Sequence, residues 1–124
     1  MRAIIHQIER IWKRWIWSWA GVIHVFRTEG SFAQWLVANA VFGILAFVLP
    51  LSGAERGFLL MGGVLVLAAE CMNTAVERIV DDIGTDRRIL AQQAKDCGSA
   101  AVMLTAMAVG VAWIGVILGL VLAG

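Results

Sequence analysis

One stretch of the sequence places oxygen-bearing side chains at helical spacing inside an otherwise apolar region. The segment AECMNTAVERIVDD, residues 69–82, contains Glu70, Asn73, Glu77, Asp81 and Asp82. On an α-helix of about 3.6 residues per turn, Glu70, Asn73 and Glu77 lie on one face, which Asp81 extends. Carboxylate and amide oxygens are the ligands that hard cations such as Mg²⁺ prefer. The spacing therefore predicts an oxygen-rich helix face suited to binding a divalent ion.

Glu70 is the deepest of these acids in the expected membrane span. Counting about 1.5 Å per residue from Gly57, Glu70 lies roughly 20 Å along the helix and Glu77 roughly 30 Å, close to the cytoplasmic boundary. A charged carboxylate near the middle of a bilayer costs roughly 2.5 kcal/mol or more, so an acid at this depth indicates function. The structural alternative is a protonated Glu70 that makes a hydrogen bond between helices.

A second cluster supplies positive charge on the same side of the membrane. The segment AKDCGSAA, residues 94–101, sets Lys95 and Asp96 immediately before an expected span. We expect free backbone N–H groups at that helix start to favour a phosphate, although a lysine beside a span can also be a simple anchor. Together with Glu29 at the foot of the first span, these residues indicate phosphoryl transfer from a metal-bound nucleotide onto a lipid.

The elements that position these residues are predicted from composition. Of the 124 residues, 60% are hydrophobic and 15% are charged, and the mean hydropathy is +0.82. A water-soluble domain of this length rarely contains so much apolar surface, so a membrane protein is expected. The uncharged runs 30–54 and 97–124 each exceed the roughly 20 residues that a membrane-crossing helix needs, whereas the run 57–69 reaches that length only by continuing through Glu70.

We therefore predict one all-α integral membrane domain, residues 1–124. Its expected elements are an amphipathic surface helix at about 2–27 and spans at about 32–49, 57–80 and 98–122. The Trp side chains of the first segment suit the headgroup level of a membrane, and the small residues of the third span suit helix packing in an oligomer. Lys and Arg concentrate before the first span and between the second and third, which predicts a cytoplasmic N-terminus.

Other features of the chain are given ordinary roles. The N-terminal segment lacks a clean apolar centre and a small-residue cleavage site, so we do not expect a secretory signal peptide. Cys71 and Cys97 do not form a CxxC pair and are expected to be reduced, small apolar side chains. His6 and His24 are expected to be polar residues at the membrane interface or on the surface helix.

These segments resemble a known family. The matching positions are SWAG at 18–21, Glu29 with Phe32, AECMNTAVERIVDDIG at 69–84 and AKDCGSAAVML at 94–104. They are similar to those of the prokaryotic diacylglycerol kinases, small trimeric membrane kinases that include undecaprenol kinases. The resemblance implies a lipid kinase of the bacterial inner membrane that uses Mg²⁺ and ATP on a membrane lipid. It also implies a homotrimer with active sites shared between protomers, and no nucleic-acid partner is expected.

The resemblance also implies roles for single residues. Glu70 takes the place of the general base that accepts the proton of the lipid hydroxyl, and Asn73 matches an active-site amide. Glu29 and Glu77 match the carboxylates that hold the metal on ATP. The remaining ATP-binding candidates are Arg10, Trp17, Asp86, Arg87, Arg88, Lys95 and Asp96. The remaining lipid-substrate candidates are Arg10, Trp19, Arg56, Ser99 and Trp113.

Some positions depart from the family pattern. Ala20 stands where relatives often have Lys, and Ala33 and Trp35 replace a polar pattern in the first span. These departures leave the catalytic set complete but do not settle the lipid acceptor. We expect diacylglycerol, and undecaprenol is the alternative. A small proton-coupled transporter or a structural membrane protein is the rival class. It would use Glu70 as a protonation switch but gives the other charged residues no role.

Overall fold

The computed structural model describes residues 2–123, which form four α-helices joined by short turns. The helices are α1 (Arg2–Thr28), α2 (Gly30–Val48), α3 (Gly53–Ile83) and α4 (Ile89–Ala123). No strand occurs in the described part of the chain. The three later helices are each long and apolar enough to cross a membrane. The expected all-α class, with three spans and one amphipathic N-terminal helix, is therefore confirmed.

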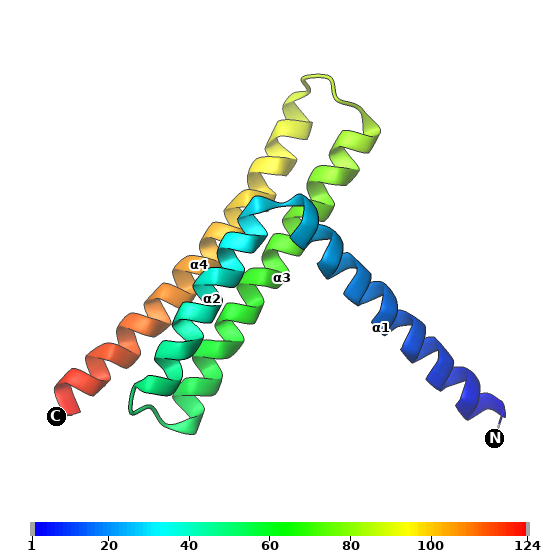
Figure 1. Cartoon of the computed structure of the whole chain (residues 1–124). Coiled ribbons are helices and arrows are strands. Elements are labelled where there is room, and N and C mark those ends of the chain that lie inside the picture. The colour runs from blue at the N-terminus through cyan, green and yellow to red at the C-terminus, as the bar shows by residue number, and fades with distance from the viewer. Residues whose placement is uncertain (1, 124) are drawn as a thin grey trace.

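The helices α3 and α4 form an antiparallel pair, and α2 packs against α3 (Figure 1). The α3–α4 pair continues past the start of α2 towards the turn at residues 84–88. Two helices begin earlier than the spans that hydropathy predicts. The helix α3 starts at Gly53 instead of about residue 57, and α4 starts at Ile89 instead of about residue 98. Helices need not stop at the membrane boundary, so hydropathy underestimates their length.

The turn between α2 and α3 closes one end of the bundle. Ser52 caps α3: its hydroxyl accepts a hydrogen bond from the Glu55 backbone N–H, while the Glu55 side chain accepts one from the Ser52 N–H. This reciprocal capping box satisfies two backbone donors at the helix start. A small apolar core lies beside the turn and consists of Ala46, Leu51, Leu59 and Trp113.

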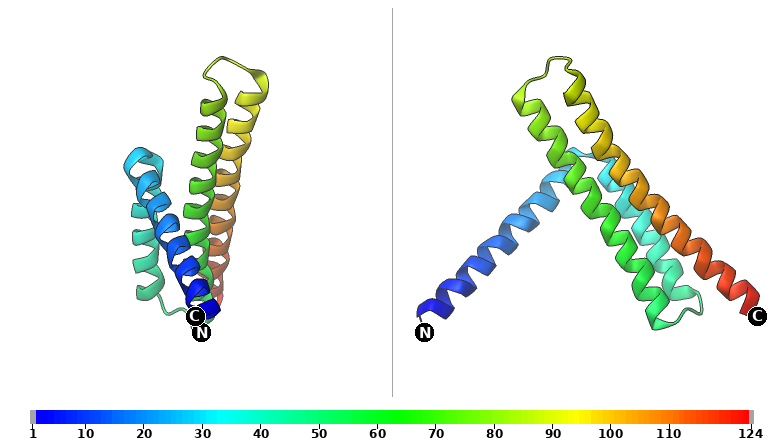
Figure 2. Two further views of the ribbon diagram at one scale, coloured as in Figure 1. Left: turned by 90° about the vertical axis from the view of Figure 1, so that its right-hand side faces the viewer. Right: turned by 180° about the vertical axis from the view of Figure 1, so that it is seen from behind.

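The helix α1 projects away from the bundle instead of packing along it, as the views in Figure 2 show. Val25, a buried hydrophobic side chain of this helix, lies near its C-terminal end, where α1 meets α2 and α3. The tryptophans nearer the N-terminus are exposed; Trp17, for example, is 68% exposed. An amphipathic helix with exposed indoles is suited to lie at a membrane surface.

Candidate active site

The end of the bundle opposite the α2–α3 turn gathers most of the predicted site residues. Glu70 and Thr74 are the buried polar side chains of the described residues, with 5% and 3% of their surface exposed. The Ser31 hydroxyl, in the first turn of α2, donates a hydrogen bond to Glu70 Oε1. Burying a carboxyl group without a partner is costly, so this bond explains how α3 accommodates Glu70.

One helical turn further along α3, Asn73 and Glu77 are joined. Asn73 Nδ2 donates to Glu77 Oε1 at 3.0 Å, as the spacing of four residues allows. The other atom of the amide, Asn73 Oδ1, is buried and has no hydrogen-bond partner among the described residues. It lies against Gly98 of α4, where a Cβ atom would collide with it. A buried acceptor without a donor is uncommon, and here it results from the close packing of α3 against α4.

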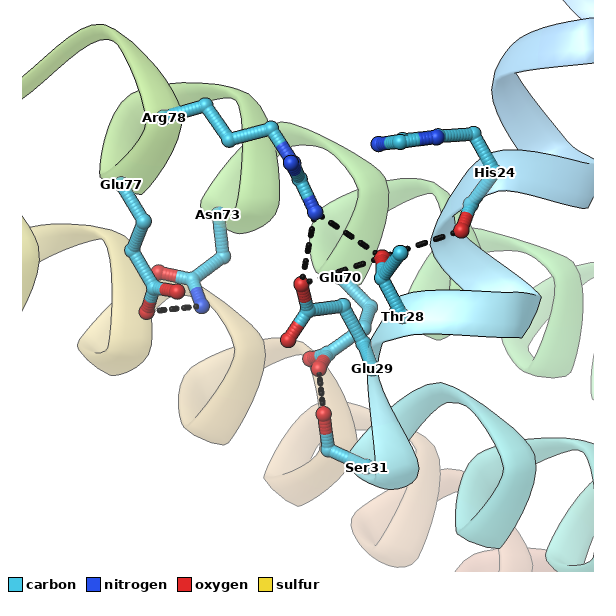
Figure 3. Close-up of polar contacts among 8 residues, drawn as sticks. All are labelled: His24, Thr28, Glu29, Ser31, Glu70, Asn73, Glu77 and Arg78. Carbon is cyan, nitrogen blue, oxygen red and sulfur yellow. Dashed lines mark hydrogen bonds and ion pairs between the residues drawn. The ribbon is translucent and has the colours of Figure 1, made fainter. Parts of the chain in front are cut away.

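Glu29 lies at the junction of α1 and α2 and faces α3. Its Oε1 is 3.2 Å from Arg78 Nη2, and the same guanidinium nitrogen donates to Thr28 Oγ1 at 2.9 Å. The Thr28 hydroxyl in turn donates to the His24 carbonyl oxygen at 3.0 Å. Figure 3 shows this network joining Glu29 and Thr28, at the end of α1, to Arg78 of α3.

Two cavities meet this group of residues. An open acidic cavity of about 640 Å³ is lined by Glu29, Glu77 and Arg78, together with Ile79, Asp81 and Asp82. A second cavity, of about 710 Å³, lies between α2, α3 and α4; its polar lining includes Ser31, Glu70, Asn73 and Ser99. Trp35 and Ala106 line this cavity and also an apolar cavity of about 320 Å³ that extends towards Trp113. The polar cavity that contains Glu70 therefore shares lining residues with this apolar slot.

The acidic cavity fits a divalent ion that arrives with a nucleotide. Glu29 and Glu77 supply hard oxygen donors on one cavity wall. Within residues 2–123, however, no three His, Cys, Asp or Glu side chains come close enough together to hold an ion by themselves. Mg²⁺ in phosphoryl-transfer sites commonly uses one or two carboxylates plus substrate phosphates and water. The donor set suits that mode of binding.

The position of Lys95 requires a correction. Because α4 begins at Ile89, Lys95 and Asp96 lie inside the helix and their backbone N–H groups are not free helix-start donors, as we had expected. Lys95 Nζ is instead 2.6 Å from Asp81 Oδ1 on α3. The lysine is thus held beside the acidic cavity by its side chain, whereas Asp96 is exposed.

The turn residues have different environments. Arg88 Nη2 donates to the carbonyl oxygens of Gly84, at 2.9 Å, and Val80, at 3.2 Å. It therefore satisfies carbonyl groups at the end of α3, a structural role that the sequence analysis missed. Asp86 and Arg87 are exposed in the same turn.

Several substrate candidates lie away from Glu70 within one chain. Arg10 and Trp19 are exposed on the projecting α1, and Trp17 lines a cavity of about 320 Å³ between α1 and α3 that also includes Arg78. Arg56 is at the opposite end of the bundle, where it donates to the carbonyl oxygens of Ala46 and Leu51.

Trp113 is also separate from the Glu70 region. It is 7% exposed, packs in the core beside the α2–α3 turn and contacts Phe42, with 5.3 Å between the ring centroids. Arg56 and Trp113 therefore lie at the end of the bundle away from Glu70, and Trp113 also lines the apolar cavity, so a role of either residue beside the lipid substrate stays a prediction. Ser99, in contrast, lines the cavity that contains Glu70.

Sequence reasoning missed two residues of the site. Ser31 bonds Glu70 across 39 positions of sequence, and Arg78 bonds Glu29 across 49. Arg78 directly follows Glu77, so its nearness to the acids was visible, but only the packing of α3 against the α1–α2 junction shows its partner.

The fold and the site define a small helical membrane protein with an acidic site at one end of its bundle. Residues 16–117 match the family described as prokaryotic diacylglycerol kinase. The chain is 35% identical to diacylglycerol kinase from Pseudomonas aeruginosa over 112 residues, which are 90% of this chain and 91% of that protein. Over 104 residues it is 34% identical to diacylglycerol kinase from Escherichia coli K12, covering 84% and 85% of the two chains.

A further relative carries a different name. Undecaprenol kinase from Bacillus subtilis is 34% identical over 104 residues, which are 82% of this chain and 83% of that protein. The extent of these matches shows that the chain belongs to the prokaryotic diacylglycerol kinase family.

Proposed function

We propose that this protein transfers the γ-phosphoryl group of ATP to the hydroxyl group of diacylglycerol, giving phosphatidic acid and ADP. Membership of the diacylglycerol kinase family supports the reaction class. The observation that supports this site is that Glu29 and Glu77 line one cavity at this end of the bundle and that Glu70 lines a second cavity together with Asn73, which bonds Glu77.

Glu70 is the proposed general base. As the hydroxyl oxygen of the lipid attacks the γ-phosphorus, a Glu70 oxygen accepts the hydroxyl proton, and the bond to the leaving ADP breaks. The burial of Glu70 beside an accessible cavity supports this role, because a hydroxyl could reach it while bulk water is largely excluded.

Glu29 and Glu77 are the proposed residues that hold Mg²⁺ on the nucleotide. When bound, the ion would neutralise negative charge on the phosphates as the phosphoryl group is transferred. The Asn73 amide holds Glu77 by a hydrogen bond. Lys95 is held at the same end of the bundle by its ion pair with Asp81, and its ammonium group would favour binding of an anionic nucleotide.

The lipid is proposed to enter along the apolar slot between α2 and α4. The acyl chains would occupy its apolar part, lined by Phe42 and Trp113, and the hydroxyl would reach the polar part at Glu70. Undecaprenol is the second candidate acceptor, because a named undecaprenol kinase is similar over most of the chain. A long isoprenoid alcohol would use the same slot and the same base.

The test is transfer of label from [γ-³²P]ATP to lipid by the purified protein in mixed micelles. Diacylglycerol and undecaprenol are supplied in separate reactions, and the organic extract is counted. We expect labelled phosphatidic acid with diacylglycerol as the preferred acceptor. Preference for undecaprenol would replace the acceptor, and the absence of label from both lipids would refute the kinase proposal.

We also propose that the protein works as a homotrimer in the bacterial inner membrane, with the N-terminus in the cytoplasm. The exposure of Arg10 and Trp19 on the projecting α1 supports sites shared between protomers, because these candidates would meet the acids of a neighbouring chain. A mass measurement of the detergent-solubilised protein should give three copies per particle. A particle of one copy would contradict the shared site.

A further inference from the structure

The hydrogen bond from Ser31 divides the two oxygens of Glu70 between different surroundings. Oε1 accepts the bond from the Ser31 hydroxyl, which is the one side-chain partner of Glu70 in the described structure. Oε2 has no hydrogen-bond partner in the described structure, but unlike Asn73 Oδ1 it is not fully buried. Glu70 also lines the cavity of about 710 Å³.

Ser31 is well placed to fix the carboxylate. It is in the first turn of α2, two residues after Glu29, so one short segment carries both the proposed metal ligand and the partner of the proposed base. A serine side chain has one rotatable bond before its hydroxyl, whereas the terminal torsion of a glutamate is broad. A bond from the hydroxyl to a carboxylate oxygen therefore restricts the carboxylate far more than the serine.

We infer that Ser31 is a positioning residue for the phosphoryl-transfer reaction: it holds Oε1 of Glu70 so that Oε2 faces the acceptor hydroxyl. This inference rests on the proposed kinase function. Without Ser31 the carboxylate rotates among orientations, and only some of them accept the proton of the lipid hydroxyl. A purely structural bond would instead stabilise the junction of α2 and α3 without affecting turnover.

Three variants separate these two roles. Ser31→Ala removes the hydroxyl, Ser31→Thr keeps it, and Thr105→Ala removes a hydroxyl that bonds only the Ala101 carbonyl of its own helix. For each variant, kcat and the KM for ATP are measured with saturating diacylglycerol, and folding is checked by the thermal midpoint of the circular dichroism signal.

We expect kcat of Ser31→Ala to fall about tenfold or more, as for loss of a hydrogen bond to a charged group, while the KM for ATP stays within about twofold. Ser31→Thr should restore kcat to within about threefold of wild type, and Thr105→Ala should match wild type. This split between kcat and KM, with rescue by the conservative variant, is not expected of a structural bond.

Two results would overturn the inference. One is a wild-type kcat in Ser31→Ala; the other is a fall in kcat that Ser31→Thr does not restore although both variants keep the wild-type thermal midpoint. If wild-type protein labels lipid and Ser31→Ala labels it equally fast, only the role of Ser31 fails. If wild-type protein labels no lipid alcohol, the proposed function itself fails.

Discussion

The close contact between Gly98 and Asn73 gives a sharp test of the site geometry. A Cβ added at Gly98 would collide with the Asn73 amide oxygen, and it would lie 3.4 Å from the amide carbon and 3.6 Å from the Asn73 Cα. The collision is with the amide oxygen, so either this side chain or the helix must shift. Gly98→Ala therefore requires either that α4 moves away from α3 or that Asn73 rotates and loses its bond to Glu77.

Both outcomes have an estimated cost. Overpacking of this kind costs about 1–3 kcal/mol, and loss of a hydrogen bond to a charged group costs about 1.5–3 kcal/mol. Replacing Gly by Ala within a helix recovers about 1 kcal/mol of stability, which leaves a net loss of roughly 0–2 kcal/mol. If the lost Asn73–Glu77 bond acts in the transition state, at about 1.4 kcal/mol per factor of ten, kcat/KM falls by about 10- to 100-fold.

The assay is lipid labelling at varied ATP, with Gly119→Ala as the matched control. Gly119 is on the same helix and a Cβ there would meet nothing within 4 Å, so this variant should be fully active. Wild-type kcat/KM together with a wild-type thermal midpoint in Gly98→Ala would show that neither a movement of α4 nor a loss of the Asn73–Glu77 bond follows, and this result would refute the reasoning.

Three further variants probe the rest of the structure. Glu77→Gln should raise the Mg²⁺ concentration for half-maximal activity about tenfold, because a neutral amide is a weaker ligand for a hard cation, and an unchanged requirement would remove Glu77 as a ligand. Arg78→Gln should raise the KM for ATP severalfold, because Glu29 loses the guanidinium that holds it at the cavity; Arg27→Gln, an exposed charge on α1, is the control, and equal values for the two variants would contradict this. The Arg78–Glu29 pair is partly exposed, so its loss should change stability by at most about 1 kcal/mol. Arg56→Gln should destabilise the fold by about 1–3 kcal/mol, since two carbonyl groups lose their donor, and an unaltered thermal midpoint would argue against that.

Much of the architecture was predictable from periodicity and hydropathy. The three- and four-residue spacing of Glu70, Asn73 and Glu77 placed them on one helix face, and the structure buries Glu70 while joining the other two. These relations lie within one helix, where the 3.6-residue repeat fixes the geometry.

The contacts between helices were not predictable from the sequence. Periodicity states which residues share a face but not which faces meet, so the Ser31–Glu70 and Arg78–Glu29 pairs remained hidden. The third span was predicted to start at about residue 98, whereas α4 begins at Ile89, because ILAQQAK contains Gln and Lys yet is composed mostly of good helix formers. Hydropathy reports where a helix can contact lipid, and the helix itself extends into water.

The central claim is that Glu70 accepts the proton of a lipid hydroxyl beside a nucleotide held by Glu29 and Glu77. The most direct measurement is the rate of label transfer from [γ-³²P]ATP to diacylglycerol by Glu70→Gln, alongside nucleotide binding by the same variant. Loss of a general base predicts a rate at least about 100-fold below wild type, with nucleotide binding retained. A Glu70→Gln protein that labels lipid at the wild-type rate would contradict the claim.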